Sequence, residues 1–288
     1  MKIAIASGKG GTGKTTVATN LASFFSDSSK IVLADLDVEE PNSKLFFTGD
    51  LQLKENKFKY IPNWDKEKCV ICNVCSSSCN FHAIIRLSTE ILVFPELCHS
   101  CYACSELCPK EALPMVPSQI GILNHYKNSK YDLVESRLQI GEEQAVPLIA
   151  QTKQYVEKHF KNDVLKIFDS PPGTSCPAIE SIKDVDFVIL VSEPTPFGLN
   201  DLKLAVETVR ELEKDFAVVI NRFGIGNEQI MNFCANEDID IIAKIPHIRE
   251  AAVSYSKGEL LIDKFPELRT EIELISEYIF SYKERAGL

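Results

Sequence analysis

The sequence predicts an α/β protein built on a mostly parallel, doubly wound β-sheet. Short apolar segments typical of buried strands alternate with longer segments whose apolar residues recur at helical spacing, which is the pattern of βαβ units. The first such strand runs directly into a glycine-rich segment and a helix, and two later strands end in aspartate. Ligands of parallel sheets bind beyond the carboxyl ends of the strands, so we expect the functional site there.

The expected strands are short apolar runs, and the expected helices repeat apolar residues every three or four positions. In chain order they are strand 3–6, helix 17–25, strand 31–34, helix 144–160, strand 164–169, strand 187–191, helix 201–213, strand 216–220, strand 241–245 and helix 267–283. Residues 120–140 alternate only in part, so we expect either a hairpin or an irregular segment there.

The glycine-rich segment has the spacing of a phosphate-binding loop, G-x-x-x-x-G-K-[ST], from Gly8 to Thr15. Glycines let several backbone N–H groups point at one spot, and the following helix adds a partial positive charge. We expect Lys14 to reach the β- and γ-phosphates of ATP and the Thr15 hydroxyl to bind Mg²⁺; the alternative is a glycine-rich connector. The predicted nucleotide-binding residues of this loop are Gly8, Lys9, Gly10, Gly11, Thr12, Gly13, Lys14, Thr15 and Thr16.

A second lysine, Lys9, makes the loop resemble the deviant Walker A motif of the MinD/ParA/nitrogenase-iron-protein family. The resemblance implies that Lys9 reaches the nucleotide of a partner subunit in a dimer, either a homodimer or a heterodimer with a paralogue. The segment from Asp35 to Asn42 resembles the family's switch I, so Asp37 is expected to position the attacking water. The alternatives are a solvated loop lysine and two exposed loop acids.

The strand at 164–169 ends in Asp169, as a Walker B strand does, and residues 170–174 resemble switch II of the Mrp branch of the same family. The resemblance implies that Asp169 holds Mg²⁺ through water and that the Gly173 N–H senses the γ-phosphate. The residues expected to act in hydrolysis are Lys9, Lys14, Asp37 and Asp169.

Asn221 and Arg222 follow the strand at 216–220, where an Asn-Arg pair of the family contacts the adenine; a simple strand-end turn is the alternative. Cys176 lies in the expected switch II, where the nitrogenase iron protein has a cluster-ligating cysteine. Its companion cysteine has no counterpart here, so a spectator thiol is favoured over a metal ligand. Cys234 is expected in the core.

Eight of the ten cysteines form an internal repeat. Cys69, Cys72, Cys75 and Cys79 follow C-x2-C-x2-C-x3-C, and Cys98, Cys101, Cys104 and Cys108 repeat it 29 residues later with Pro109 next. The repeat resembles the signature of bacterial ferredoxins with two [4Fe–4S] clusters. In those ferredoxins the fourth cysteine of each run serves the other cluster. The implied ligand sets are Cys69, Cys72, Cys75 and Cys108 for cluster 1, and Cys98, Cys101, Cys104 and Cys79 for cluster 2. Zinc, which also binds Cys-x2-Cys pairs, is the alternative.

The cysteine-rich module covers residues 62–118 and interrupts a P-loop ATPase domain formed by residues 1–61 and 119–288. Residues 83–87 and 91–94 are expected to form a short hairpin and residues 112–116 a closing strand. By resemblance, the module is an inserted α+β ferredoxin-like 2[4Fe–4S] domain.

The formal net charge of −10 makes nucleic acid and anionic membranes unexpected partners, because binding to both depends on positive charge. No apolar run has the length of a membrane span, and the chain enters its first strand at once, so a cytoplasmic location is expected. Clustered cysteines in a reducing compartment favour metal binding over disulfides.

Together these features predict an ATP-binding and slowly ATP-hydrolysing protein with ATP, Mg²⁺ and two [4Fe–4S] clusters as cofactors. The nucleotide state of the dimer would be coupled to electron transfer to an unidentified redox or cofactor-assembly partner. One alternative is an iron–sulfur or metal-cofactor assembly factor of the Mrp kind. A second is a positioning ATPase of the ParA/MinD kind whose clusters sense redox state.

Overall fold

The computed structural model describes residues 1–287, which divide into two compact units. Unit 1 contains Met1–Lys54, Leu123–Arg137 and the chain from Ile149 onward. Unit 2 contains Glu55–Ile122 and Leu138–Leu148. This second unit extends beyond residues 62–118, because the flanking strands and a later loop contact it as well.

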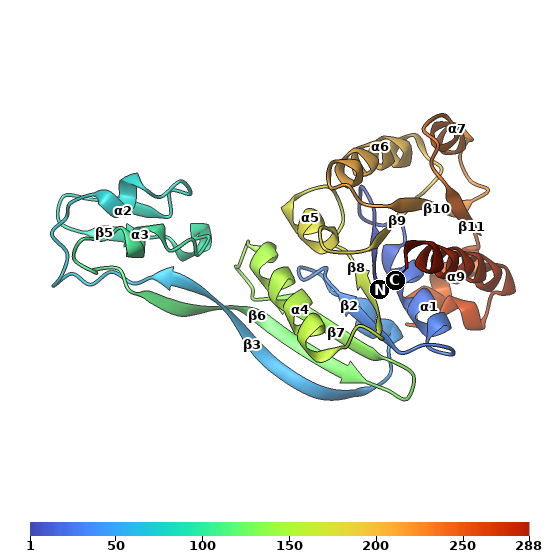
Figure 1. The fold of residues 1–288 in the computed structure, drawn as a ribbon, viewed down its shortest axis with the longest axis horizontal. Helices are drawn as coiled ribbons and strands as arrows, with labels where there is room; N and C mark the ends of the chain where they lie inside the picture. Colours follow the sequence, from blue (N-terminus) through green and yellow to red (C-terminus); the bar gives the residue numbers. More distant parts are fainter. Residues whose placement is uncertain (288) are drawn as a thin grey trace. The chain divides into compact units, whose positions relative to one another are not determined.

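The central sheet of the described chain has nine strands in the order β11-β10-β9-β1-β8-β2-β7-β6-β3 (Figure 1). Every neighbouring pair from β11 to β7 is parallel, which confirms the predicted parallel sheet. The strands are β1 (Lys2–Ala6), β2 (Ile31–Asp35), β3 (Asp50–Pro62), β6 (Met115–Lys127), β7 (Asp132–Leu138), β8 (Leu165–Asp169), β9 (Phe187–Ser192), β10 (Phe216–Phe223) and β11 (Ile241–Pro246).

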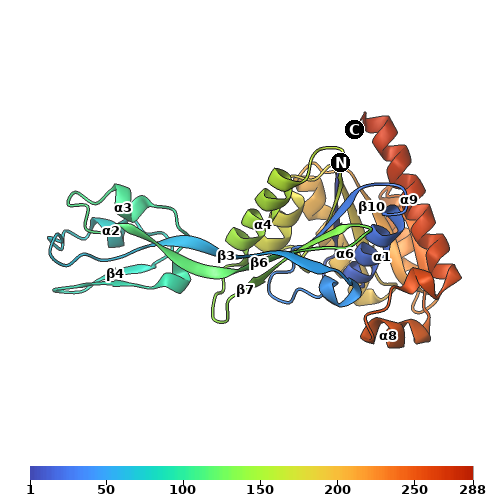
Figure 2. The ribbon, with the colours of Figure 1, turned by 90° about the horizontal axis from the view of Figure 1, so that it is seen from below.

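One face of the sheet in unit 1 is covered by α1 (Lys14–Phe25) and α9 (Pro266–Ala286), which lie side by side (Figure 2). On the opposite face, α5 (Cys176–Ile182) contacts β1 and α6 (Pro196–Glu211) contacts β9 (Figure 1). Outside the two cysteine runs, the other helical segments of the described chain are α4 (Ala145–His159), α7 (Gln229–Asn236), α8 (Arg249–Ser256) and the 3-10 turns Ser43–Phe46, Pro95–Leu97 and Leu261–Asp263.

Strand β3 is the largest element that the sequence pattern does not predict. Its first seven residues are all exposed and only Leu51 and Leu53 are apolar, so the hydrophobic pattern is weak. Residues 120–140 form a hairpin: β6 and β7 are neighbours in the sheet and are joined by a four-residue turn. Helix α6 begins five residues before the expected start, because the Thr195 hydroxyl accepts a hydrogen bond from the Gly198 N–H and Pro196 fits the first helical turn.

Unit 2 contains a short antiparallel hairpin, β4 (Ile84–Arg86) and β5 (Ile91–Val93), where the sequence predicts one. Two single-turn helices, α2 (Val74–Ser77) and α3 (Ala103–Glu106), occupy equivalent positions of the two cysteine runs. The expected closing strand begins later than predicted, at Met115, because residues 112 and 114 instead accept backbone hydrogen bonds from Asp65 and Asn63.

None of the helices in residues 1–287 combines the length and the apolar character that a membrane crossing requires.

Candidate nucleotide site and cysteine centres

The phosphate-binding loop lies between β1 and α1, at the carboxyl edge of the parallel strands. Two of its glycines are required by close packing. A side chain at Gly8 would collide with the backbone of Asp201 in α6, and one at Gly13 would collide with the Asn221 amide. Gly13 also has a left-handed conformation, with φ at 97°, at the start of α1. The loop is therefore held between α6 and the end of β10.

Lys14 faces a group of carboxylates at the ends of β2 and β8. It is buried, and burial lowers its pKa, although Asp169, Asp37 and Asp35 raise it. Asp35 and Asp169 are paired in register across the two strands and are both fully buried. Burial raises the pKa of each, and the charge of Asp169 raises that of Asp35 further. A divalent cation bound beside these carboxyl groups would favour their ionised form, and carboxylate oxygens are ligands that Mg²⁺ prefers.

Buried polar atoms without a hydrogen-bond partner gather around this loop. In the described chain they include Thr12 Oγ1, Asn42 Oδ1, Asp169 Oδ1 and Ser170 Oγ. A buried polar group without a partner is costly, so several of them at one place indicate that a polar ligand belongs there. The residues present therefore fit the phosphates of a nucleotide and its Mg²⁺.

Asp35 lies in the candidate site, although the sequence analysis did not single it out. One of its carboxylate oxygens accepts the Asp37 N–H at 3.1 Å, and the other accepts the N–H groups of Asn42 and Ser43, both at 2.9 Å. Ser43 in turn donates to Asp169 Oδ2 at 3.3 Å. Asp35 thus fixes the backbone of the expected switch I. The signal was present, since Asp35 precedes Asp37 at the same strand end, but sequence alone does not separate their roles.

Lys9 is held inside its own subunit by Glu193, which follows β9. The Lys9 Nζ donates to Glu193 Oε1 at 2.6 Å, and Arg222 donates to the other carboxylate oxygen at 2.9 Å. Arg222 also donates to the Gly11 carbonyl at 3.2 Å. Glu193 is buried, so both cations converge on a shielded anion. The sequence showed this glutamate only as the first residue of a loop.

The other predicted site residues lie around the same loop. Asn221 and Arg222 lie within β10, and the Asn221 amide donates to the Thr12 carbonyl at 2.7 Å. The Gly173 N–H donates to the Ser7 carbonyl at 3.0 Å, so the expected γ-phosphate sensor is engaged with the loop itself. Asp37 is half-buried, and burial raises the pKa of its carboxyl while Lys14 lowers it.

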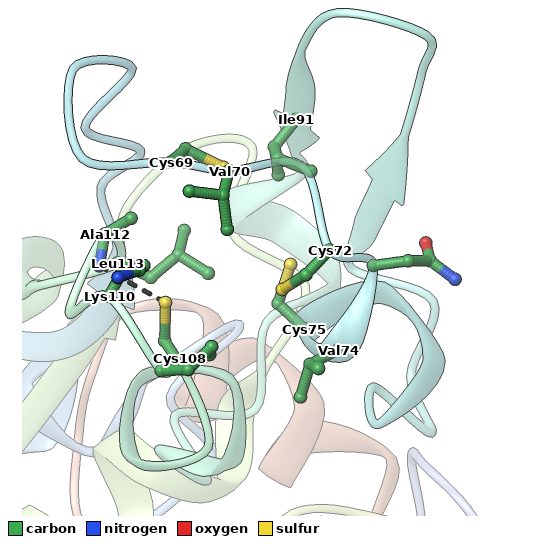
Figure 3. A pocket seen from close by; sticks show the side chains of 12 residues that line it. Cys69, Val70, Cys72, Val74, Cys75, Ile91, Cys108, Lys110, Ala112 and Leu113 are labelled. Carbon is green, nitrogen blue, oxygen red and sulfur yellow. Dashed lines mark hydrogen bonds between the residues drawn. The ribbon is translucent and has the colours of Figure 1, made fainter.

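The eight repeat cysteines line two small hollows in unit 2. Figure 3 shows the first, into which the four sulfur atoms point. The structure groups Cys69, Cys72, Cys75 and Cys108 around this hollow, and Cys79, Cys98, Cys101 and Cys104 around the second. We refer to these groups as set 1 and set 2. The fourth cysteine of each run lies with the three cysteines of the other run.

The backbone repeats with the same 29-residue period as the cysteines. Non-glycine residues with positive φ occur in three matched pairs: Ile71 and Ser100, Asn73 and Tyr102, His82 and Glu111. Such backbone conformations are unfavourable for side chains other than glycine, and they persist where the surrounding structure or a ligand imposes them. Their recurrence beside both hollows shows that the two halves of unit 2 are built alike.

The thiols of set 1 are arranged as hydrogen-bond acceptors. Cys69 Sγ accepts the Ile71 N–H at 3.4 Å, and Cys108 Sγ accepts the Ala112 N–H at 3.2 Å. Burial raises the pKa of Cys104 in set 2 to about 11, so this thiol stays protonated unless a cation compensates the thiolate. In residues 1–287, no three His, Cys, Asp or Glu side chains are close enough to bind one metal ion together. Four sulfurs spread around a hollow suit a group with several metal corners better than a single ion.

The two remaining cysteines lie away from these hollows. Cys176 is exposed in the first turn of α5, and Cys234 is fully buried in α7, where the sequence predicts a core residue. Within the part of the chain that the structure describes, Cys176 belongs to no group of three His, Cys, Asp or Glu side chains that could hold a metal ion.

Comparison with known proteins agrees with this geometry. The sequence profile of the CobQ/CobB/MinD/ParA nucleotide-binding domain matches residues 3–262. The uncharacterized protein MJ0579 of Methanocaldococcus jannaschii is 32% identical over 97% of both chains. The iron–sulfur cluster carrier protein of Pyrococcus furiosus is more distant, at 21% identity over 99% of this chain and 88% of the relative. Among solved structures, MinD of Pyrococcus horikoshii with Mg-ADP is similar, with a TM-score of 0.59, 17% identity, and coverage of 96% of this chain and 95% of that one. The phosphate loop, the parallel sheet and the profile lead to one conclusion: this chain belongs to the CobQ/CobB/MinD/ParA family of P-loop nucleotide-binding proteins.

Proposed function

We propose that this protein binds and hydrolyses ATP as a dimer and couples its nucleotide state to electron transfer through two [4Fe–4S] clusters. The observation that carries the proposal is the grouping of eight cysteines into two sets of four, each around its own hollow. A reducing cytoplasm would keep these thiols free for iron.

In the nucleotide half of the proposal, the buried Lys14 neutralises phosphate charge, and Thr15 and Asp169 hold Mg²⁺. Asp37 orients the attacking water, and Asp35 keeps Asp37 in place through its backbone. Asn221 and Arg222 complete the site beside the adenine. Positioning and charge stabilisation are the main tasks of a protein in phosphoryl transfer, and this set of side chains can carry out both.

Lys9 and Gly173 are the residues through which the nucleotide state would be sensed. For Lys9 to reach a partner subunit's nucleotide, it must leave Glu193. For the Gly173 N–H to contact the γ-phosphate, it must leave the Ser7 carbonyl. Both changes exchange one hydrogen bond for another, so the cost of switching is small compared with the gain from a phosphate contact.

In the cluster half, set 1 and set 2 would each bind one [4Fe–4S] cluster, which supplies a one-electron carrier of low potential when bound. The chain's own contribution is to present four thiolates per hollow, donate backbone N–H groups to them and surround them with apolar side chains. A hydrophobic cluster in unit 2 supports this role, because two of its five buried members are Cys75 and Cys104.

The decisive experiment is low-temperature EPR of the anaerobically purified, dithionite-reduced protein, with and without MgATP. Signals of two [4Fe–4S]⁺ centres that change with MgATP support the proposal. Two signals that are indifferent to MgATP would show two independent modules, and zinc in place of iron would overturn the cluster assignment. A Lys14→Ala variant that keeps both signals but loses their response to MgATP would link the response to the phosphate loop.

The second candidate function is assembly of iron–sulfur proteins. It is favoured by the similarity to the Pyrococcus furiosus protein named as an iron–sulfur cluster carrier and by the exposure of Cys72 and Cys101, one thiol in each set. Incubation of the loaded protein with an apo-ferredoxin distinguishes the two functions. Transfer of intact clusters, faster with MgATP, would favour assembly, whereas retention of both clusters with electron transfer favours our proposal.

A further inference from the structure

A buried ion pair in unit 2 has no part in the sites described so far. Lys59 in β3 and Glu142 in the 138–148 segment lie 2.8–2.9 Å apart, with side chains only 2% and 10% exposed. Removing two charges from water costs about as much as their attraction returns, so a buried pair is a poor source of stability. Its presence therefore suggests a use for the charges themselves.

The pair lies beside the second hollow. The backbone carbonyl of Tyr60, the residue after Lys59, accepts a hydrogen bond from the Ser100 hydroxyl at 2.6 Å. Before Cys98 in the chain, the backbone carbonyl of Glu96 accepts a hydrogen bond from the side-chain amide of Gln144 at 2.9 Å. Glu142 also accepts the Gln144 N–H at 3.0 Å, so the segment that carries Cys98 is fixed against both partners of the pair.

The hydrogen bonds on either side of Cys98 place the pair next to set 2. Ser100, which is bonded to the residue after Lys59, lies between Cys98 and Cys101 in the chain. Glu96, which is bonded to Gln144, lies two residues before Cys98. Both side chains of the pair are shielded from solvent, so their charges act on the segment that carries Cys98 with little screening by water.

We propose that the Lys59–Glu142 pair sets the reduction potential of the cluster held by Cys79, Cys98, Cys101 and Cys104. This inference rests on the proposed function, because it requires a redox group in that hollow. In a reduction step the cluster gains one electron from an external donor, and no bond forms or breaks. Lys59 favours the added negative charge and Glu142 disfavours it, so each partner shifts the potential in its own direction.

The test is a potentiometric titration with dithionite on the full-length, anaerobically purified protein, followed by EPR. We expect Lys59→Met to lower one of the two midpoint potentials, and Glu142→Gln to raise the same one, each by about tenfold in the reduction equilibrium, or 59 mV for a one-electron couple. The double variant should return close to the wild-type value, and the other midpoint should stay constant. Lys54→Met and Glu143→Gln, which change exposed residues of the same charge, are the controls.

Opposite shifts from the two single variants cannot come from a merely structural role, which would disturb both clusters or move both variants in the same direction. If both variants leave the midpoints unchanged, or shift them in the same direction, the inference is wrong while the proposed function stands. If the wild-type protein holds no [4Fe–4S] cluster, both fail. Should Lys59→Met lose its clusters, Glu142→Gln alone decides, because it keeps the shape and a hydrogen-bonding group: an upward shift supports the inference, and any other result overturns it.

Discussion

The two units of this protein differ in what holds them together. Unit 1 has a core of aliphatic and aromatic side chains from the sheet and from α1 and α9, most of them fully buried. The hydrophobic cluster between the two cysteine runs of unit 2 has five buried members, and two of these are the cysteines Cys75 and Cys104. A core this small seldom stabilises a fold without a disulfide, a metal or a similar cross-link. Unit 1 is thus expected to fold from its own side chains, and unit 2 from its side chains together with a bound group.

The backbone shows the same contrast. Of the non-glycine residues with positive φ in the described chain, six lie in the cysteine repeat of unit 2 and three in unit 1. Each such residue costs about 1–2 kcal/mol, and a small core does not offset six of them. In unit 1 the few strained positions include Arg222, which lies at the nucleotide site. The other two, Glu213 and Asp238, follow α6 and α7, so strain gathers at an expected ligand site in unit 2 but not in unit 1.

The largest expected effect is the unfolding of unit 2 when iron is removed. Chelation under reducing conditions should abolish hydrogen-exchange protection in residues 62–118 while β1, β8 and β9 keep theirs, because only unit 2 relies on the bound group. Hydrogen exchange followed by mass spectrometry measures both regions in one sample. Cys75→Ala should have the same local effect, and Cys176→Ala, which removes an exposed thiol outside both sets, should not. Full hydrogen-exchange protection of residues 62–118 in the iron-free protein would show that unit 2 does not depend on a bound group.

The next effect concerns the nucleotide site alone. Lys14→Ala should lower the rate of ATP hydrolysis about 100-fold or more, because it removes a buried positive charge from the phosphates. Iron content and cluster spectra should stay at wild-type values, since Lys14 belongs to unit 1. Phosphate release and iron analysis on one preparation test both statements, with the exposed Lys30→Ala as control. A Lys14 variant that loses its iron would show that the two units do not fold independently.

A smaller effect is expected at the ion pair that holds Lys9. Glu193→Gln removes the charge that competes with a partner's nucleotide for this lysine, and a charged hydrogen bond is worth about 1.5 kcal/mol or more. The MgATP-dependent dimer should then form at about tenfold lower protein concentration, as measured by analytical ultracentrifugation. Glu207→Gln, an exposed change in α6, is the matched control. Weaker dimerisation in the Glu193 variant would mean that Glu193 orients Lys9 instead of restraining it.

The smallest expected effect is on the rate of iron loss when backbone strain in unit 2 is relieved. His82 and Glu111 are exposed equivalents in the two repeats, with φ at 52° and 51°. Replacing either with glycine should relieve about 1 kcal/mol of backbone strain and lose no side-chain contact, so iron loss to a chelator should slow about fivefold. Release is followed by the absorbance of the iron–chelator complex. Lys110→Gly, at an exposed position without positive φ, should speed the loss because it only adds freedom to the unfolded chain.

Much of the nucleotide site could be predicted from the sequence, because its motif residues are close together in the chain. The phosphate loop, the strand-end aspartates and the two cysteine runs are local patterns, and the geometry of a turn or a short loop follows from them. The approach of Asp35 to the switch backbone is also local, since it joins residues only two to eight positions apart. The sequence analysis did not identify this role of Asp35, because Asp35 and Asp37 are the same residue type at the same strand end and the pattern does not tell them apart.

Tertiary structure alone decided the contacts between distant residues. Lys9 meets Glu193 across 184 positions, and Lys59 meets Glu142 across 83. No local pattern relates such residues, because a charged side chain in a loop or in an exposed strand has the same sequence signature whether or not a partner reaches it. The sequence by itself determined which residue types can bind phosphate and iron. The order of the strands decided which charged side chains lie next to those binding residues, because folding brings together groups that are far apart in the chain.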